Sequence, residues 1–418
     1  MEVKPGYKQT EVGVIPEEWD VKPLGEIGGV RMCKRVLKHQ TREHGDVPFY
    51  KIGTFGGGAD AFISQSLFDE FRRKYSFPRN GDILISAAGT IGRTVAYDGA
   101  PAYFQDSNIV WIDNDESKAT NAYLWHRYQV TKWSISHGGT VARLYNDSLR
   151  TKIHIPLPPL PEQRAIATAL SDVDGLLGGL DRLIAKKRDL KQAAMQQLLT
   201  GQTRLPGFQG EWEVKRLGEL FNFSGGYSAS RDQLSAEGHC YLHYGDIHGS
   251  TKTCIDADTD FQDIPKLDIP LKRVSSGSLL DDGDVVFVDA SEDDAGTSKH
   301  VVVVNKDKKP FISGLHTIVA KSKTDELAHE YRRYCFQTPA IRQQFLFYSV
   351  GTKVSGISKS NIPKLTLSFP SVPEQTAIAS VLSEMDTELA VLEQRREKTR
   401  ALKQAMMQEL LTGKTRLV

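Results

Sequence analysis

The sequence predicts an α+β protein built as a pseudo-twofold tandem duplication, in which two variable domains alternate with two long helices. Two observations predict this fold class. Nearly identical segments begin at Pro161 and Pro373, and short β-rich runs with Gly, Asp and Asn turns precede each of them. The expected boundaries are 1–160 and 206–372 for the variable domains, and 161–205 and 373–418 for the helices.

The repeated segments establish the duplication. PEQRAIATALSDVD begins at Pro161 and PEQTAIASVLSEMD at Pro373, while LKQAAMQQLLTGQTRL ends at Leu205 and LKQAMMQELLTGKTRL at Leu417. Both pairs are 212 residues apart, so the repeat runs without a gap. Weaker repeats, such as EEWDVKPLGEI and GEWEVKRLGEL, precede them. One structural frame therefore carries two different interiors.

The first variable domain contains the strand-like runs DILIS and TVAYDG, followed by a short helical stretch over 123–133. The first repeated segment then predicts a long helix, because apolar residues recur at alternating spacings of four and three, the narrow stripe of a coiled coil. Pro161 suits its first turn and Gly201 suits the position after its last turn. Gly175, Gly178 and Gly179 either allow a close helix crossing or are simply tolerated.

The second variable domain contains the runs DVVFV and HVVVVN and a helical stretch over 328–347, and the second helix repeats the apolar stripe. About 38 residues make a rod of roughly 55–60 Å. We assign the stripes of both helices to a subunit interface. Its residues are Ile166, Leu170, Val173, Leu177, Leu180, Ile184, Ile378, Leu382, Met385, Leu389 and Leu392.

Composition indicates an ordinary globular protein, with 39% hydrophobic and 25% charged residues and a net charge of +1. A nucleic-acid surface on such a chain must be local or completed by partners. None of the four cysteines forms a CxxC pair, which argues against a zinc knuckle and suits a reducing cytoplasm. No apolar run approaches the roughly 20 residues of a membrane helix, so a cytoplasmic protein is expected.

Enzyme motifs are missing from the sequence. Gly413-Lys414-Thr415 ends like a Walker A loop, but Gln408 stands where its first glycine belongs, so a helix cap is the better interpretation. GxGxxG, HExxH and GxSxG do not occur. An acidic cluster precedes Lys299 and His300 and fits either a solvated turn, which we favour, or a Mg²⁺ site of a nuclease. It contains Asp281, Asp282, Asp284, Asp289, Glu292, Asp293 and Asp294.

The PEQxAIA opening and LLTGxTR closing of each repeat, with two variable domains between them, resemble the specificity (S) subunits of type I restriction-modification systems. The resemblance covers essentially the whole chain. A Gly-Thr element before each proline run supports it, with Leu144 and Ile357 following a turn later. A Gly89-Thr90-Ile91-Gly92 loop has only Ala295-Gly296-Thr297-Ser298 as a counterpart, which puts a shared role of that loop in doubt.

The resemblance implies a non-catalytic reader of a bipartite site in double-stranded DNA. Each variable domain would be a target recognition domain for one half-site, and the helices would pack antiparallel as a spacer. Two methylation (M) subunits carrying S-adenosylmethionine would dock on the helices. Restriction (R) subunits with ATP- and Mg²⁺-dependent activity would join them, and this chain itself would hold no cofactor.

DNA-contacting residues are expected on exposed loops that carry polar, cationic or glycine residues. In the first domain they are Lys51, Thr54, Phe55, Gly56, Gly57, Arg93, Gly139, Thr140, Arg143 and Tyr145. In the second they are Tyr244, Asp246, His248, Lys252, Lys299, His316, Gly351, Thr352 and Lys353. Two other functions stay open at this point: a self-sufficient metal-dependent nuclease, and a coiled-coil scaffold without DNA specificity.

Overall fold

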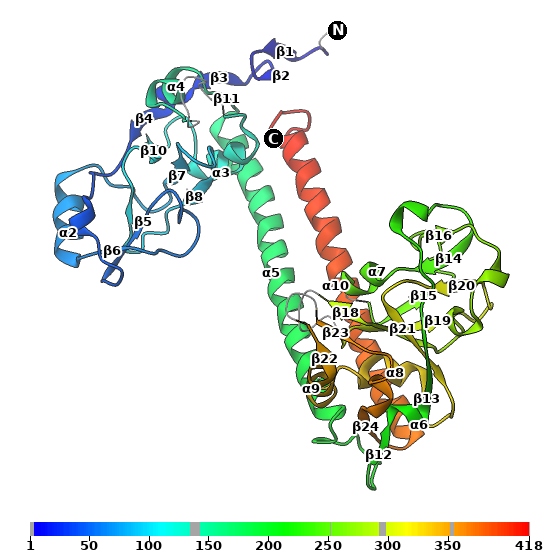
Figure 1. Ribbon diagram of the computed structural model, residues 1–418. Coiled ribbons are helices and arrows are strands. Elements are labelled where there is room, and N and C mark those ends of the chain that lie inside the picture. Colours follow the sequence, from blue (N-terminus) through cyan, green and yellow to red (C-terminus); the bar gives the residue numbers. More distant parts are fainter. Residues whose placement is uncertain (1–3, 134–142, 251, 292–297, 352–354, 418) are drawn as a thin grey trace. The chain divides into compact units, whose positions relative to one another are not determined.

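The computed structural model describes residues 4–133, 143–250, 252–291, 298–351 and 355–417. The chain forms two compact units: unit 1 combines Met1–Asp181 with Gln394–Val418, and unit 2 is Arg182–Glu393. Two helices, α5 (Leu160–Leu198) and α10 (Val372–Leu410), each give one part to each unit (Figure 1). The sequence predicts four parts, with each long helix as a part of its own, whereas each of the two units contains a segment of both helices. The four-part division therefore stays a prediction.

Unit 1 contains two main sheets. The first is antiparallel, with strand order β4 (Gly28–Arg31), β10 (Ile109–Asn114), β7 (Ile83–Ser86) and β8 (Thr94–Ala96). The second has the order β6 (Phe62–Ile63), β5 (Val47–Tyr50) and β9 (Tyr103–Phe104), and its strands β5 and β9 run parallel.

Smaller elements complete unit 1. Strands β1 (Tyr7–Thr10) and β2 (Gly13–Pro16) form a hairpin, and β3 (Asp20–Pro23) pairs with β11 (His154–Leu157). The helices are α1 (Leu24–Ile27), η1 (Lys38–Gln40), α2 (Gln65–Lys74), α3 (Asn121–Val130) and α4 (Asn146–Thr151).

Unit 2 repeats this plan. Its larger sheet has the order β13 (Phe221–Gly225), β21 (Thr317–Ser322), β17 (Val285–Val288), β19 (His300–Val304) and β15 (Cys254–Asp256). Its smaller sheet has the order β16 (Lys266–Leu267), β14 (His239–Leu242) and β20 (Phe311–Ser313), with β14 and β20 parallel. β12 (Glu213–Arg216) pairs with β24 (Thr366–Phe369), as β3 pairs with β11.

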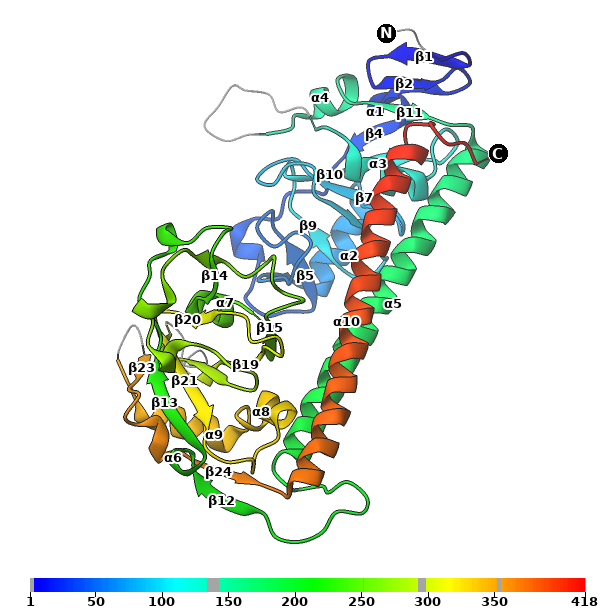
Figure 2. The ribbon, with the colours of Figure 1, turned by 90° about the vertical axis from the view of Figure 1, so that its right-hand side faces the viewer.

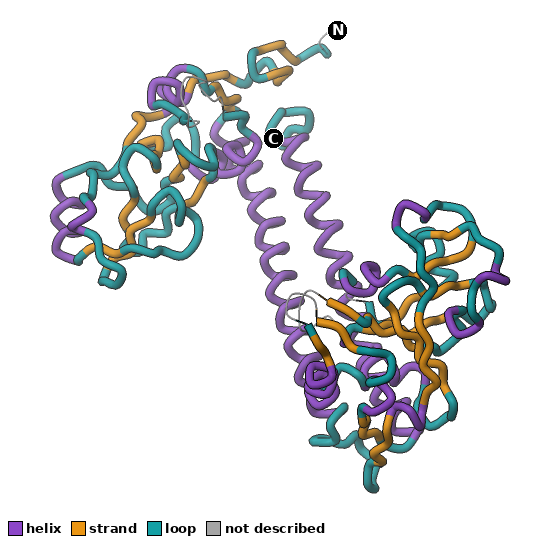
Figure 3. Tube along the Cα trace, viewed as in Figure 1, coloured by secondary structure: helices purple, strands orange, loops and turns teal. Residues whose placement is uncertain are grey.

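The remaining elements of unit 2 are short. The helices are α6 (Leu217–Leu220), α7 (Tyr244–His248), α8 (His329–Cys335) and α9 (Pro339–Tyr348), with 3-10 turns at Arg231–Gln233, Leu271–Arg273, Ser276–Ser278 and Ile362–Lys364. A third sheet has the order β18 (Ala290–Ser291), β23 (Ser355–Ile357) and β22 (Ser349–Val350). The mixture of helices, strands and loops in Figure 3 is the α+β class that the sequence predicts.

In each unit a short helix joins the larger sheet to the long helices. In unit 1, Tyr123 of α3 is buried in one core with Ile166 of α5 and Met407 of α10. In unit 2, Tyr331 of α8 is buried with Ile378 of α10, and the Tyr334 hydroxyl donates to Asp386 at 2.7 Å. The sheets therefore pack on the long helices through equivalent elements (Figure 2).

The ends of the long helices follow the signals in the sequence. Both helices are 39 residues long and begin one residue before the prolines Pro161 and Pro373. Gly201 and Gly413 both have φ of +70°, the left-handed conformation that a helix-ending glycine adopts at low cost. A Cβ atom at Gly175 or Gly179 meets nothing within 4 Å, so no close crossing requires glycine at these two positions.

Within each unit, the segments of α5 and α10 run antiparallel and are joined by ion pairs. In unit 1, Asp174 pairs with Lys403 at 2.7 Å and Asp181 with Arg396 at 3.5 Å. In unit 2, Lys187 pairs with Glu388 at 2.7 Å, Lys191 pairs with Asp386, and Arg188 pairs with Glu393. Residue numbers rise along one helix as they fall along the other, which defines the antiparallel direction.

The apolar stripe is buried by the chain itself, which corrects its assignment to an interface with other subunits. Ile166, Leu170, Leu180, Ile184, Ile378, Leu382 and Leu389 are at most 9% exposed. Val173, Leu177, Met385 and Leu392 are half-buried. The stripe therefore packs within the chain and is not free to contact a separate subunit. In the described part of the chain, no helix has the length and apolarity needed to cross a membrane.

Candidate nucleic-acid interface

The repeated motif residues at the helix ends form buried clamps. Glu162, which is fully buried, accepts hydrogen bonds from Trp19 Nε1 at 2.9 Å and from the guanidinium of Arg416. In unit 2, Arg204 forms the same two-point contact with the buried Glu374. The arginine that closes one repeat thus pairs with the glutamate that opens the other, so the motif holds the helix ends together and is not presented to DNA.

The glutamine of each PEQ motif anchors the variable domain. Gln163 is fully buried; its Nε2 donates to the Lys118 and Pro158 carbonyls, and its Oε1 accepts from the Thr120 amide at the start of α3. Gln375 forms the same three bonds in unit 2, to the Glu326 and Pro370 carbonyls and from the Ala328 amide. A side-chain amide with all three bonds satisfied in a buried site fixes the domain on its helix.

The candidate interface of unit 1 lies at the edge where the parallel strands β5 and β9 end. Two loops follow these strands: residues 51–58 and residues 105–108. They line a hollow of about 590 Å³, and Arg35, Lys38 and Arg143 also line it. Arg143 donates to the Ser107 carbonyl at 2.9 Å, and Lys51 pairs with Asp60 at 2.8 Å. The hollow therefore presents mostly hydrogen-bond donors and positive charge.

Unit 2 places different residues at the equivalent edge, where the parallel strands β14 and β20 end. Tyr244, Asp246 and His248 lie on α7 directly after β14, and His316 follows β20. The ring of Tyr244 meets that of His316 edge-on at 5.4 Å, and His316 Nδ1 lies 3.3 Å from Asp289. Burial raises the pKa of the Asp289 carboxyl, while the neighbouring His316 lowers it. This edge is aromatic, and its carboxylates are accompanied by two cations: Arg231 lies 3.7 Å from Asp246, and Lys299 donates to the His248 carbonyl.

Other predicted contact residues of unit 1 lie at different depths. Phe55 is 1% exposed and packs in the core of the smaller sheet, so its side chain is not presented to DNA, which corrects that prediction. Thr54 closes the turn after β5 by accepting from the Lys51 amide. Gly56 has φ of +79°, and the exposed Arg93 donates to the Phe55 carbonyl next to it. The Gly57 amide donates to the Thr54 carbonyl at 3.0 Å. Tyr145, 53% exposed, precedes α4.

The remaining predictions for unit 2 are also spread out. Lys252 is exposed and pairs with Asp260 at 2.7 Å, and Lys299 donates to the His248 carbonyl, which brings it to α7. Gly351 is exposed with φ of +145°. Gly139, Thr140, Thr352 and Lys353 lie outside the described residues.

The acidic cluster of unit 2 caps a strand. Asp281 and Asp284 both pair with Lys321 at 2.7 Å, and Asp282 accepts from the Asn305 amide. Burial raises the pKa of Asp284. Glu292, Asp293 and Asp294 lie outside the described residues. Among the residues that the structure describes, no group of three or more His, Cys, Asp and Glu side chains can hold a metal ion.

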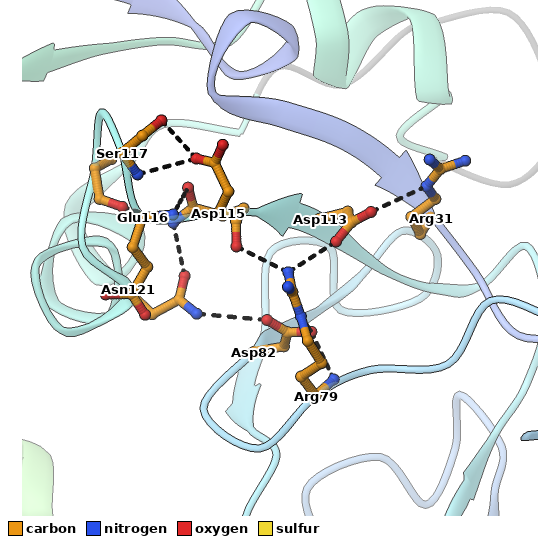
Figure 4. A network of polar contacts seen from close by, with 10 residues as sticks. Arg31, Arg79, Asp82, Asp113, Asp115, Glu116, Ser117 and Asn121 are labelled. Atoms are coloured by element: carbon orange, nitrogen blue, oxygen red, sulfur yellow. Dashed lines mark hydrogen bonds and ion pairs between the residues drawn. The ribbon is translucent and has the colours of Figure 1, made fainter.

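Unit 1 has the reversed charge pattern at the same place. Asp82 and Asp284 each precede the central strand, β7 or β17. Arg79 stands three residues before Asp82 and donates to Asp113, the fifth residue of β10, at 2.9 Å (Figure 4). Unit 2 has Asp281 and Lys321 at these two positions. The reversal indicates that this network is structural, because catalytic chemistry requires particular charges at particular places.

Several basic side chains of unit 1 were missed by the sequence analysis. Arg35 and Lys38 line the hollow, and Lys34 and Arg42 are exposed on the same segment between β4 and β5. The detectable signal was local charge: Lys34, Arg35, Lys38 and Arg42 lie within nine residues without an acidic residue between them.

Comparison with known proteins identifies two copies of one domain. The family model described as the type I restriction modification DNA specificity domain matches residues 16–184 and 209–400. A Haemophilus influenzae protein, provisionally named type I restriction enzyme specificity subunit S.HindORF215P, is 57% identical over 174 residues. That match covers 42% of this chain and 45% of the relative, so this chain spans less than half of that protein. The Methanocaldococcus jannaschii type I restriction enzyme MjaVIII specificity subunit is 23% identical over 96% of this chain and 94% of its own.

Solved structures share the fold. The type I restriction-modification S subunit from M. genitalium aligns with a TM-score of 0.58 at 14% identity, over 98% of both chains. A chain from a structure of type I restriction-modification complex assembly and conformational transition aligns with a TM-score of 0.54 at 16% identity, over 96% of this chain and 99% of that one.

Proposed function

Because this chain belongs to the family of type I restriction-modification DNA specificity domains, we propose that units 1 and 2 each read one half of a split DNA site. Recognition of DNA sequence is the function of the chain, and the family is not catalytic by itself. The nuclease and scaffold alternatives have no support from the family match, and the ion pairs with Lys321 give Asp281 and Asp284 a role that needs no metal.

One observation carries the proposal. Equivalent loops follow the parallel strands of both smaller sheets, yet Lys51 and Arg143 lie at this edge of unit 1 while Tyr244 and His316 lie at that of unit 2. Cationic side chains match the acceptors of guanine in the major groove, whereas a carboxylate such as that of Asp246 on α7 accepts from the amino group of cytosine. A bipartite DNA site requires two domains of the same fold that present different side chains to the bases, as these two units do.

The helices supply the other part of the proposal. We propose that α5 and α10 form an antiparallel coiled coil, for which the buried stripe and the ion pairs between them are the support. In the four-part division expected from the sequence, residues 161–205 and 373–418 are then the spacer. A straight helix of 39 residues is about 58 Å long, longer than the roughly 34–36 Å of one DNA turn. The helix length sets the gap between half-sites.

Partners complete the system in this proposal. Two M subunits dock on the outward faces of the helices and supply S-adenosylmethionine chemistry, and R subunits supply ATP- and Mg²⁺-dependent restriction in the cytoplasm. The chain holds no cofactor of its own and binds DNA weakly without these partners, because its net charge is only +1.

The test is a methylation map. The chain is expressed with its genomic neighbours, and N6-methyladenine is mapped across the host DNA by single-molecule sequencing. The expected result is a split motif of two short half-sites with a fixed gap that disappears when this chain is deleted. A stable chain with no methyltransferase partner and no such motif would contradict the proposal.

Variants at the two edges sharpen this test. Lys51→Ala with Arg143→Ala is expected to relax base preference in one half-site only, and Tyr244→Ala with His316→Ala in the other only. A change in both half-sites from either pair, in folded proteins, would show that the edges are not separate readers.

A further inference from the structure

Residues 32–46 join β4 to β5 in unit 1, and we call this segment the basic arm. It contains four basic residues, Lys34, Arg35, Lys38 and Arg42, and two acidic ones at its end. All four basic side chains are exposed. The corresponding segment of unit 2, residues 226–238, contains one basic and two acidic residues. The two readers therefore differ in charge at the same place in the fold.

The basic arm is held in place by the domain. Cys33 is buried, and the Tyr103 hydroxyl donates to the Lys34 carbonyl at 3.0 Å. The backbone of Arg42 pairs with that of Phe62 in both directions. A fixed backbone loses little conformational entropy when the side chains bind a ligand, so the charges of the arm are preorganised.

The basic arm also adjoins the candidate interface. Arg35 and Lys38 line the hollow with Lys51 and Arg143, while Asp106 is its one acidic lining residue. Asp106 contacts Arg35 Nε at 2.8 Å and is only 15% exposed, whereas Arg35 is 66% exposed. Asp106 therefore orients Arg35 without covering it, and cationic donors surround the place where DNA is proposed to lie.

We infer that the basic arm is a phosphate-binding element that supplies most of the salt-dependent affinity of this chain for duplex DNA. The inference rests on the proposed function and makes the two half-sites unequal. Unit 1 anchors the DNA backbone through the four cations of the arm, whereas the corresponding segment of unit 2 offers only Arg231, which already lies 3.7 Å from Asp246. Lysine and arginine at phosphates give affinity without sequence preference, so the arm acts before and apart from sequence reading.

The experiment measures the salt dependence of binding. The full chain is titrated onto a fluorescent 40-base-pair duplex of mixed sequence at a series of KCl concentrations. Each phosphate contact adds about 0.9 to the slope of log affinity against log salt. Lys38→Gln with Arg42→Gln is therefore expected to lower the slope by about 2 and the affinity at low salt by about tenfold or more.

A matched pair of charges serves as the control. Lys306 and Lys308 are exposed on the turn before β20, opposite the end of that strand where the interface of unit 2 lies. Lys306→Gln with Lys308→Gln removes the same charge and is expected to leave the slope unchanged. Lys38→Arg is expected to retain it. An unchanged slope in the arm variant, or an equal fall in the control variant, would overturn the inference.

Failure of the inference is distinct from failure of the proposed function. The arm variant is expected to retain both half-site sequences in the methylation map, with lower occupancy. A wild-type chain that supports no split motif contradicts the proposed function, whatever its salt slope. A split motif with an unchanged slope contradicts the basic arm alone.

Discussion

At the scale of single residues, burial fixes the protonation state of His300 in unit 2. Its ring lies against Phe287 and Phe336, with centroids 5.5 and 5.2 Å away. Desolvation lowers its pKa from 6.5 to about 4, so the folded chain keeps this histidine neutral. Between pH 6.5 and pH 4, His300 binds a proton in the unfolded chain but not in the folded chain. The free energy of unfolding is therefore unaffected by the protonation of His300 above pH 6.5 and falls as the pH drops from 6.5 towards 4.

This difference gives a testable pH dependence. Between pH 7.5 and pH 5, His300 is expected to account for about 2 kcal/mol of lost stability. His300→Leu removes that share, which urea denaturation of both chains at several pH values measures. His39→Gln, at an exposed position, is the matched control. A His300→Leu chain whose stability falls with pH as steeply as that of the parent would contradict the assignment.

At the scale of elements, the ion pairs beside β7 and β17 occupy equivalent positions with their charges exchanged, and we expect either arrangement to stabilise the sheet edge. Arg79→Asp places a third carboxylate beside Asp82 and Asp113. The free energy of unfolding is expected to fall by roughly 1–2 kcal/mol. Loss of the exposed Arg79–Asp113 pair accounts for only a small part of this fall. Asp113 also pairs with Arg31 at 3.4 Å, and unit 2 has Ser224 at the place of Arg31. Adding Asp113→Lys together with Arg31→Ser therefore recreates the pattern of unit 2 and is expected to restore most of the stability. Thermal unfolding of the single and the triple variant measures this, and equal losses in both would show that the two edges are not equivalent.

Elements with a periodic signal could be predicted, and elements set by tertiary pairing could not. The apolar stripe, Pro161 and Gly201 define α5 locally: its start is predicted to within one residue, and Gly201 lies three residues after its end, although the expected segment 161–205 runs beyond the helix. The interface depends on β5 and β9, two short strands far apart in the chain whose parallel pairing no local pattern reveals. The same limit explains Phe55, since a lone aromatic residue in a glycine-rich loop does not show which way it faces.

The basic arm was missed for a related reason. Its four cations occur in an irregular segment without a motif, and the net charge of +1 hides them. Only the fold brings Arg35 and Lys38 beside Lys51 and Arg143. The predicted loops after β5 and β14 remain the candidate interface, and which of their residues touch bases stays a prediction.

At the scale of the whole molecule, the proposal makes helix length a measure of distance along DNA. Asp181 of α5 pairs with Arg396 of α10, so deleting residues 177–183 and 394–400 removes one heptad from facing parts of the antiparallel pair. Seven residues correspond to about 10 Å of helix, or about three base pairs of DNA.

The deletion is therefore expected to shorten the gap between half-sites by about three unspecified base pairs and to leave both half-site sequences unchanged. The methylation map measures gap and sequence together. Gly175→Ala with Gly179→Ala is the control, because the added Cβ atoms meet nothing within 4 Å and raise helix propensity without changing length. A folded deletion variant that directs methylation at the original gap would exclude the helices as the spacer, because a shorter spacer must bring the two half-sites closer together.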